Sequence, residues 1–152
     1  MKARIYLQSL DPGLKDKCWS LIFRVTKDRR AIGVSIERQF GKQTTRGIIN
    51  LGVRQHHRYG GWHPKQGPNA EYYDSVIETG VDTTALGGHM FRELMEEHVP
   101  ITSIEFGGNM KVKRRLLSDL KSAIDEGRIV MPGDGFWREV RTQLRNYKLL
   151  DR

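Results

Sequence analysis

The opening of the chain decides its fold class, because residues 4–25 read RIYLQSLDPGLKDKCWSLIFRV. The stretches 4–10 and 18–25 are rich in β-branched and aromatic residues, which favour strands, and Asp11-Pro12-Gly13 between them is typical of a turn. These stretches predict a hairpin. Residues 31–40, AIGVSIERQF, partly alternate in polarity and follow the turn-like stretch 28–30, so a third antiparallel strand is expected. The sequence therefore begins with a β-meander.

Beyond residue 70 the pattern alternates between strands and helices. Residues 76–81, 101–106 and 129–131 predict strands. Apolar residues at helical spacing predict a helix from Leu86 that ends before Pro100, a helix over 111–126 and a last helix from Phe136 to Tyr147. Together with the meander, this order predicts an α/β domain over residues 1–152, in which helices flank a mixed central sheet.

The middle of the chain is rich in glycine and proline and has little periodic pattern. It contains Gly60-Gly61, His63-Pro64 and Gly67-Pro68, and within it only residues 48–53 look strand-like. We therefore expect a loop-rich insert at about residues 41–70, and long loops in compact domains are often functional. The insert is also basic, since no acid occurs between Arg38 and Ala70 in a chain whose net charge is +8.

Cations in and beside this insert alternate with aromatic and histidine side chains. Cations that contact phosphates and rings that stack on bases are the physical basis of nucleic-acid grooves. The pattern predicts a nucleic-acid-binding surface formed by Arg38, Lys42, Arg46, Arg54, Arg58 and Lys65. A solvated basic loop without a ligand is the alternative. Zinc is only weakly indicated by His56, His57 and His63, because neither cysteines nor a helical His spacing accompany them.

Composition limits the remaining possibilities. At 152 residues the chain can bury roughly two-thirds of its unfolded surface without disulfides or metals. Its single cysteine, Cys18, lies in an apolar stretch and cannot form a disulfide within the chain, which favours a reducing compartment. No run approaches the ~20 apolar residues of a membrane span, and no signal-peptide pattern opens the chain. We expect a cytoplasmic protein without a membrane partner.

Two aspartates stand where strands are predicted to end. Asp11 follows the first strand, and Asp82 lies between the strand at 76–81 and the next helix. The strand ends of α/β folds collect ligands and catalytic groups, and paired carboxylates suit Mg²⁺ or Mn²⁺. With a phosphodiester between two such ions, hydrolysis becomes possible. The alternative remains open that Asp11 is a turn residue and that Asp82 or Thr83 caps a helix.

The ordered combination of these motifs resembles the nuclease domain of the large terminase subunit of tailed bacteriophages, which belongs to the ribonuclease H-like superfamily. The resemblance rests on residues 9–13 (SLDPG), 81–88 (VDTTALGG), 104–109 (IEFGGN) and 117–132 (LSDLKSAIDEGRIVMP). It implies a ribonuclease H-like fold and a metal-dependent endonuclease that cleaves double-stranded DNA during genome packaging. It also implies two Mg²⁺ or Mn²⁺ ions, and it covers most of the chain except the insert.

By this resemblance Asp11 and Asp82 would be the first two catalytic, metal-binding acids. Family members add a third acid on a C-terminal helix after a stretch like Gln143-Leu144-Arg145-Asn146-Tyr147, and Asp151 is the late candidate here. The acidic helix of the family is not complete by residue 152, so we expect a domain shortened at its C-terminus. Implied partners are double-stranded DNA, an ATPase domain, the small terminase subunit and the portal, in the host-cell cytoplasm. A Holliday-junction-resolvase-like nuclease and a non-catalytic nucleic-acid-binding module are the alternatives.

Overall fold

A computed structural model of the chain describes residues 3–12, 17–41, 44–61, 74–82, 87–104 and 110–146. Strands and helices follow one another as β1 (Ile5–Pro12), β2 (Lys17–Val25), β3 (Ala31–Phe40), α1 (Thr45–Arg58), β4 (Ser75–Asp82), α2 (Gly87–Glu96), β5 (Ile101–Ile104), α3 (Met110–Asp125), β6 (Ile129–Val130) and α4 (Gly135–Asn146). None of the helices in these ranges is long and apolar enough to cross a membrane.

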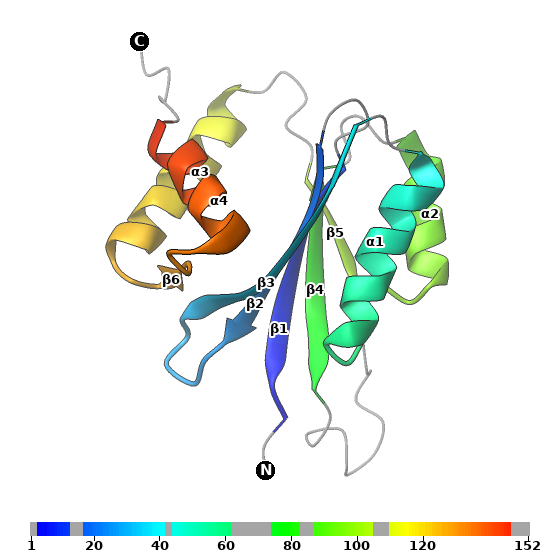
Figure 1. Cartoon of the computed structure of the whole chain (residues 1–152), viewed down its shortest axis with the longest axis horizontal. Coiled ribbons are helices and arrows are strands. Elements are labelled where there is room, and N and C mark those ends of the chain that lie inside the picture. Colours follow the sequence, from blue (N-terminus) through cyan, green and yellow to red (C-terminus); the bar gives the residue numbers. More distant parts are fainter. Residues whose placement is uncertain are drawn as a thin grey trace.

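The strands form one mixed sheet in the order β5-β4-β1-β2-β3-β6. The β1–β2 and β2–β3 pairs are antiparallel, whereas β1–β4, β4–β5 and β3–β6 are parallel. The predicted meander and the alternation after it are therefore confirmed. Figure 1 shows the sheet between two helical layers, with α1 and α2 on one face and α3 and α4 on the other. This is the predicted α/β class of fold, a mixed central sheet flanked by helices.

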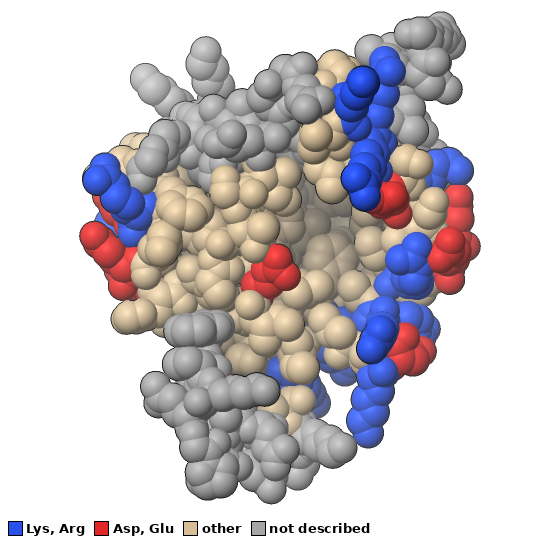
Figure 2. All heavy atoms as spheres, turned by 180° about the vertical axis from the view of Figure 1, so that it is seen from behind, with Lys and Arg blue, Asp and Glu red and all other residues tan. Residues whose placement is uncertain are grey.

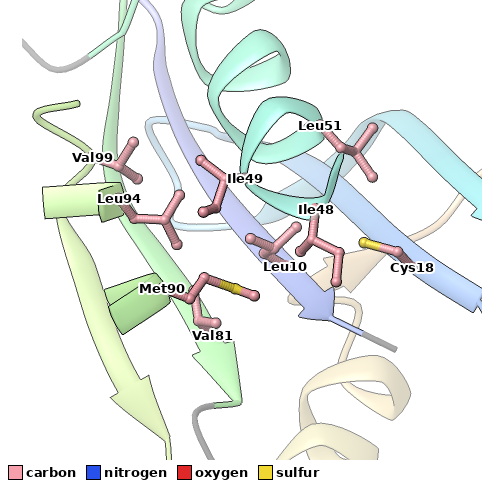
Figure 3. Packing of buried hydrophobic residues seen from close by; sticks show 9 residues of the cluster. All are labelled: Leu10, Cys18, Ile48, Ile49, Leu51, Val81, Met90, Leu94 and Val99. Carbon is pink, nitrogen blue, oxygen red and sulfur yellow. The ribbon is translucent and has the colours of Figure 1, made fainter. Parts of the chain in front are cut away.

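The face under α1 and α2 holds the main apolar core. Leu10 from β1 and Val81 from β4 meet Ile48, Ile49 and the other side chains of the cluster, all nearly inaccessible to solvent (Figure 3). Gly52 lets α1 approach the sheet closely, because a Cβ there would lie 3.0 Å from a methyl of Leu10. Burial of this apolar surface is the main term that fixes the two helices to the sheet.

A buried hydrogen-bonded network extends the core along the same face. The Gln8 amide donates to the Gly52 carbonyl of α1 at 2.9 Å and to the Ser20 hydroxyl at 3.0 Å, and Thr79 donates to Gln8 at 3.0 Å. The Ser20 hydroxyl in turn donates to Gln55 of α1. Polar groups buried in this way are retained only when they are paired, so the network helps to fix where α1 sits.

The prediction of a strand at residues 48–53 is wrong, because α1 runs through it. Its buried residues include Ile48, Leu51, Gly52 and Gln55, which recur every three to four positions and face the sheet. Thr44 caps the helix by accepting a hydrogen bond from Gly47 N at 3.0 Å. The expected loop-rich insert at 41–70 is thus a helix over much of its length, and residues 62–70 lie outside the described ranges.

The opposite face of the sheet is covered over β2 and β3 by α4. Trp137 packs edge-on against Phe23 of β2, with ring centroids 5.3 Å apart. It also lies over Gly33 of β3, where a Cβ would come within 2.7 Å of the indole ring. Helix α3 contacts β6, which is itself paired to the far edge of β3.

Candidate active site

Asp11 and Asp82 lie side by side at one edge of the sheet. In the parallel pairing of β1 with β4, Leu10 is opposite Val81, so the next residue on each strand stands at the same level. Leu10 and Val81 are buried under α1 and α2. Because successive side chains point to opposite faces, the two carboxylates project from the other face, on strands that are about 4.8 Å apart. We call Asp11 and Asp82 the acid pair.

A β-bulge in β4 places the two carboxylates of the acid pair on the same face of the sheet. The pairing shifts between Tyr6 and Leu7, so that Tyr6 is opposite Val76 but Leu7 is opposite Glu78, and Ile77 is the extra residue. Without this shift Asp11 would be opposite Val81 and Asp82 would face the apolar core, because a slip of one residue exchanges the faces of a strand. The bulge thus decides whether the two acids share a face.

The two carboxylates influence each other electrostatically. The pKa of Asp11 is raised above its ordinary value, first by partial desolvation of the carboxyl and second by the nearby negative charge of Asp82. A raised pKa means that the ionised form is disfavoured in the folded protein. A proton or a cation bound between the two carboxylates would relieve this strain, and oxygen donors of this kind suit hard divalent cations.

An aromatic and cationic wall borders the acid pair. Across β1 and β2 Asp11 is opposite Trp19, and across β2 and β3 Trp19 is opposite Arg38, so these residues continue one row on the same face. The Arg38 guanidinium lies 5.1 Å from the Trp19 ring and 3.9 Å from the ring of Phe136 on α4, and it pairs with Glu139. Helix α4 therefore closes this half of the face.

The neighbouring half of the same face is open. Ser9, Asp11 and Glu78 are exposed there, as is Thr102 of β5, which donates to Glu78 at 2.7 Å. Viewed from behind, the surface is hollowed between the sheet and the side of the molecule that carries α3 and α4 (Figure 2). A ligand at the acid pair would therefore rest on open sheet with α4 as a side wall.

The predicted nucleic-acid-binding residues are divided between two sides of the sheet. Arg38 lies on the face of the acid pair, within the wall formed with α4. Arg46, Arg54 and Arg58 belong to α1 on the other side, where Arg46 pairs with Glu93 and both Arg54 and Arg58 pair with Glu37. Lys42 and Lys65 lie outside the described residues. The described members of the set therefore do not form one continuous surface.

The other predicted site residues either lie outside the described residues or do not join a metal site. Asp151 and His63 lie outside the described residues, whereas His56 is buried in α1 with its ring centroid 5.7 Å from that of His57. Among the residues that the structure describes, no group of three or more His, Cys, Asp or Glu side chains converges as a metal site. The acid pair itself agrees with the expectation that both aspartates lie at strand ends.

Sequence reasoning missed two features of the site. The bulge at Ile77 leaves no recognisable signal, because the residue is an ordinary strand former in an ordinary strand pattern. The pairing of Arg38 with Glu139 joins residues 101 positions apart, so no local pattern could have revealed it. A charge on β3 opposite an aromatic residue on β2 was the only available hint.

Comparison with solved structures places the fold among phage nuclease domains. The large terminase nuclease of the thermophilic phage G20c with bound zinc is 21% identical, with a TM-score of 0.64 over 95% of this chain and 71% of that one. The same nuclease with bound magnesium is 20% identical, with a TM-score of 0.64 over 95% and 65%. The P22 large terminase nuclease domain is 13% identical, with a TM-score of 0.53 over 93% and 67%. No family model and no curated protein sequence matches the chain.

Proposed function

We propose that this chain is a metal-dependent DNA endonuclease of the phage terminase type. The single observation that carries the proposal is the acid pair, two carboxylates held at the same level on adjacent parallel strands of an open sheet face. The fold shared with terminase nuclease domains supports this assignment. The related solved nuclease with bound zinc or magnesium supports dependence on a divalent cation.

The chemistry of the acid pair fits Mg²⁺ or Mn²⁺. The pKa of Asp11 is raised first by desolvation and second by the charge of Asp82, and the two carboxylates supply oxygen ligands and excess negative charge, which hard cations prefer. Asp11 and Asp82 would hold the metal, and Asp151 remains the predicted third ligand. When bound, a pair of such ions would activate water and neutralise charge at the scissile phosphate.

The residues around the acid pair would seat the substrate. Ser9 and Thr102 are exposed, and their side chains are small and polar. A bulky phosphodiester backbone can therefore approach Asp11 and Asp82 without displacing a side chain of the core. Trp19 and Arg38 hold α4 beside the site. Double-stranded DNA is the proposed substrate, and an ATPase domain, the small terminase subunit and the portal are the proposed partners in the host-cell cytoplasm.

Plasmid cleavage with Mg²⁺ or Mn²⁺ tests the proposal directly. Asp11→Asn and Asp82→Asn should each lower the nicking rate by more than about 100-fold, because even outer-shell partners of a metal are commonly worth 10- to 100-fold. The matched control is Glu78→Gln, on the same strand and face but four residues from Asp82, roughly 13 Å along β4. It can still accept the hydrogen bond from Thr102, so its nicking rate should stay within about 3-fold of the original.

Thermal denaturation of each variant accompanies the cleavage assay, so that loss of activity is not confused with loss of fold. Cleavage that survives both aspartate substitutions would contradict the proposal. If the unsubstituted chain binds DNA but does not cleave it, the result would instead favour the non-catalytic binding module.

A further inference from the structure

The cations that were expected to bind nucleic acid and that lie in the described ranges, Arg38, Arg46, Arg54 and Arg58, are all paired with acids. Arg46, Arg54 and Arg58 of α1 all pair with glutamates at 2.7 to 3.3 Å. These residues also lie on the side of the sheet opposite the acid pair. A duplex seated over Asp11 and Asp82 would therefore be separated from them by the sheet itself.

Helix α3 carries a different cluster of cations. Lys111, Arg114 and Arg115 are all exposed, and within the described ranges none of them forms an ion pair. Residues at spacings of three and four lie on one face of a helix, so the three charges point the same way. The first turn of α3 contains no acid. We call Lys111, Arg114 and Arg115 the α3 patch.

The α3 patch lies near the edge of the sheet that carries the acid pair. Asp82 pairs with Ile104 at the end of β5, and α3 begins at Met110, six residues later. A chain of six residues spans at most about 22 Å, which bounds the distance from Ile104 to the first turn of α3. In Figure 1 α3 begins at the same end of the molecule at which β1, β4 and β5 finish.

The space between the two is suited to a polyanion. Figure 2 shows Lys and Arg side chains, with Asp and Glu side chains among them, along the side of the hollow that carries α3 and α4. Duplex DNA carries one negative charge per about 1.7 Å of helix axis, so a duplex over the acid pair extends phosphates past both sides of the hollow. Carboxylates repel such a ligand, and unneutralised cations nearby would offset that repulsion.

We propose that the α3 patch holds the phosphate backbone of duplex DNA beside the acid pair, an inference that rests on the proposed nuclease function. Its contacts would be to phosphates, so it would position the duplex without reading its sequence. The guanidinium groups of Arg114 and Arg115 can each donate two hydrogen bonds to one phosphate.

Binding of a 25-base-pair duplex in EDTA tests this inference, because cleavage is then absent. The variant Lys111→Gln, Arg114→Gln, Arg115→Gln is compared with Arg46→Gln, Arg54→Gln, Arg58→Gln, which removes the same number of charges from α1. Fluorescence anisotropy should show affinity lowered by at least about 10-fold in the first and less than about 3-fold in the second. The dependence of log K on log salt should become shallower by about 2 to 3 for the α3 variant.

The double variant Arg114→Lys, Arg115→Lys keeps the charges and should retain most of the binding, which attributes the loss in the triple variant to the removal of charge. Equal losses in the α3 and α1 variants would overturn the inference, as would a larger loss in the α1 variant or no duplex binding by the original chain. If Asp11→Asn abolishes cleavage while the α3 variant binds normally, the nuclease function stands and the inference about α3 fails.

Discussion

The two faces of the sheet differ in how completely their side chains are buried. Under α1 and α2, apolar side chains and a hydrogen-bonded network are almost fully buried. On the opposite face α4 covers only the part formed by β2 and β3, and large apolar side chains of α3 such as Val112 and Leu116 are each 40% exposed. The face under α1 and α2 therefore supplies most of the stability, and the other face keeps the acid pair accessible.

This division has a physical cause in the alternation of side chains along each strand. On β1, Leu10 contributes to the core and Asp11 faces the open side, and on β4 the same holds for Val81 and Asp82. Because neighbouring residues face opposite ways, the core residues also fix the direction of the acids. Stability and the candidate site are thus coupled through single strands, although they occupy separate faces.

The largest expected effect comes from removing a side chain of the packed face. Leu51→Ala should lower the free energy of unfolding by about 2 to 5 kcal/mol, because Leu51 is fully buried and its loss leaves a cavity. Leu116→Ala on α3 is the matched control and should cost less than about 1 kcal/mol, because that side chain is 40% exposed. Urea denaturation measures both. Equal costs would show that the two faces are packed alike.

A second prediction tests how firmly α4 is seated on the looser face. Gly33→Ala places a Cβ within 2.7 Å of the Trp137 ring, which is itself held against Phe23. We expect a loss of about 1 to 3 kcal/mol and a change in tryptophan fluorescence. Gly80→Ala is the control on the open half of the same face, since its Cβ would meet Ile104 at an ordinary 3.5 Å. An undisturbed fluorescence spectrum in Gly33→Ala would mean that α4 moves freely.

The smallest expected effect concerns Asp11. Its pKa in the folded protein is raised, so the ionised carboxyl opposes folding at neutral pH, and this cost disappears as the pH falls through that pKa. Asp11→Asn should therefore raise the melting temperature at pH 7 slightly, corresponding to less than about 1 kcal/mol of unfolding free energy for so exposed a group, and the gain should shrink as the pH falls. Melting curves between pH 4 and pH 8 measure it.

Asp28→Asn provides a control of opposite sign. The pKa of Asp28 is lowered, chiefly by a hydrogen bond from the Thr26 hydroxyl, so the ionised carboxyl favours folding at neutral pH and that benefit is lost as the pH falls. The variant should melt slightly lower at pH 7. A decrease in Asp11→Asn as well would show that the carboxyl of Asp11 is stabilised by partners and does not repel Asp82.

The six described strands and three of the four described helices could be predicted from the sequence, because their periodic patterns and turn residues act locally. Helix α1 was missed, since Ile48, Ile49 and Val53 are β-branched and only packing against the sheet reveals their helical spacing. Asp11 and Asp82 were predicted as strand-end acids from local context. Their shared face depends on the bulge at Ile77, which long-range pairing creates and no local pattern shows.

The burial of Cys18 makes its reactivity a measure of how often α1 separates from the sheet. Its thiol is inaccessible beneath α1, and desolvation together with the charge of Asp11 raises its pKa to about 12. Alkylating reagents attack the thiolate, so the folded molecule is protected both sterically and chemically. As the only cysteine in the chain, it makes the rate of alkylation a direct measure of how often α1 lifts from the sheet.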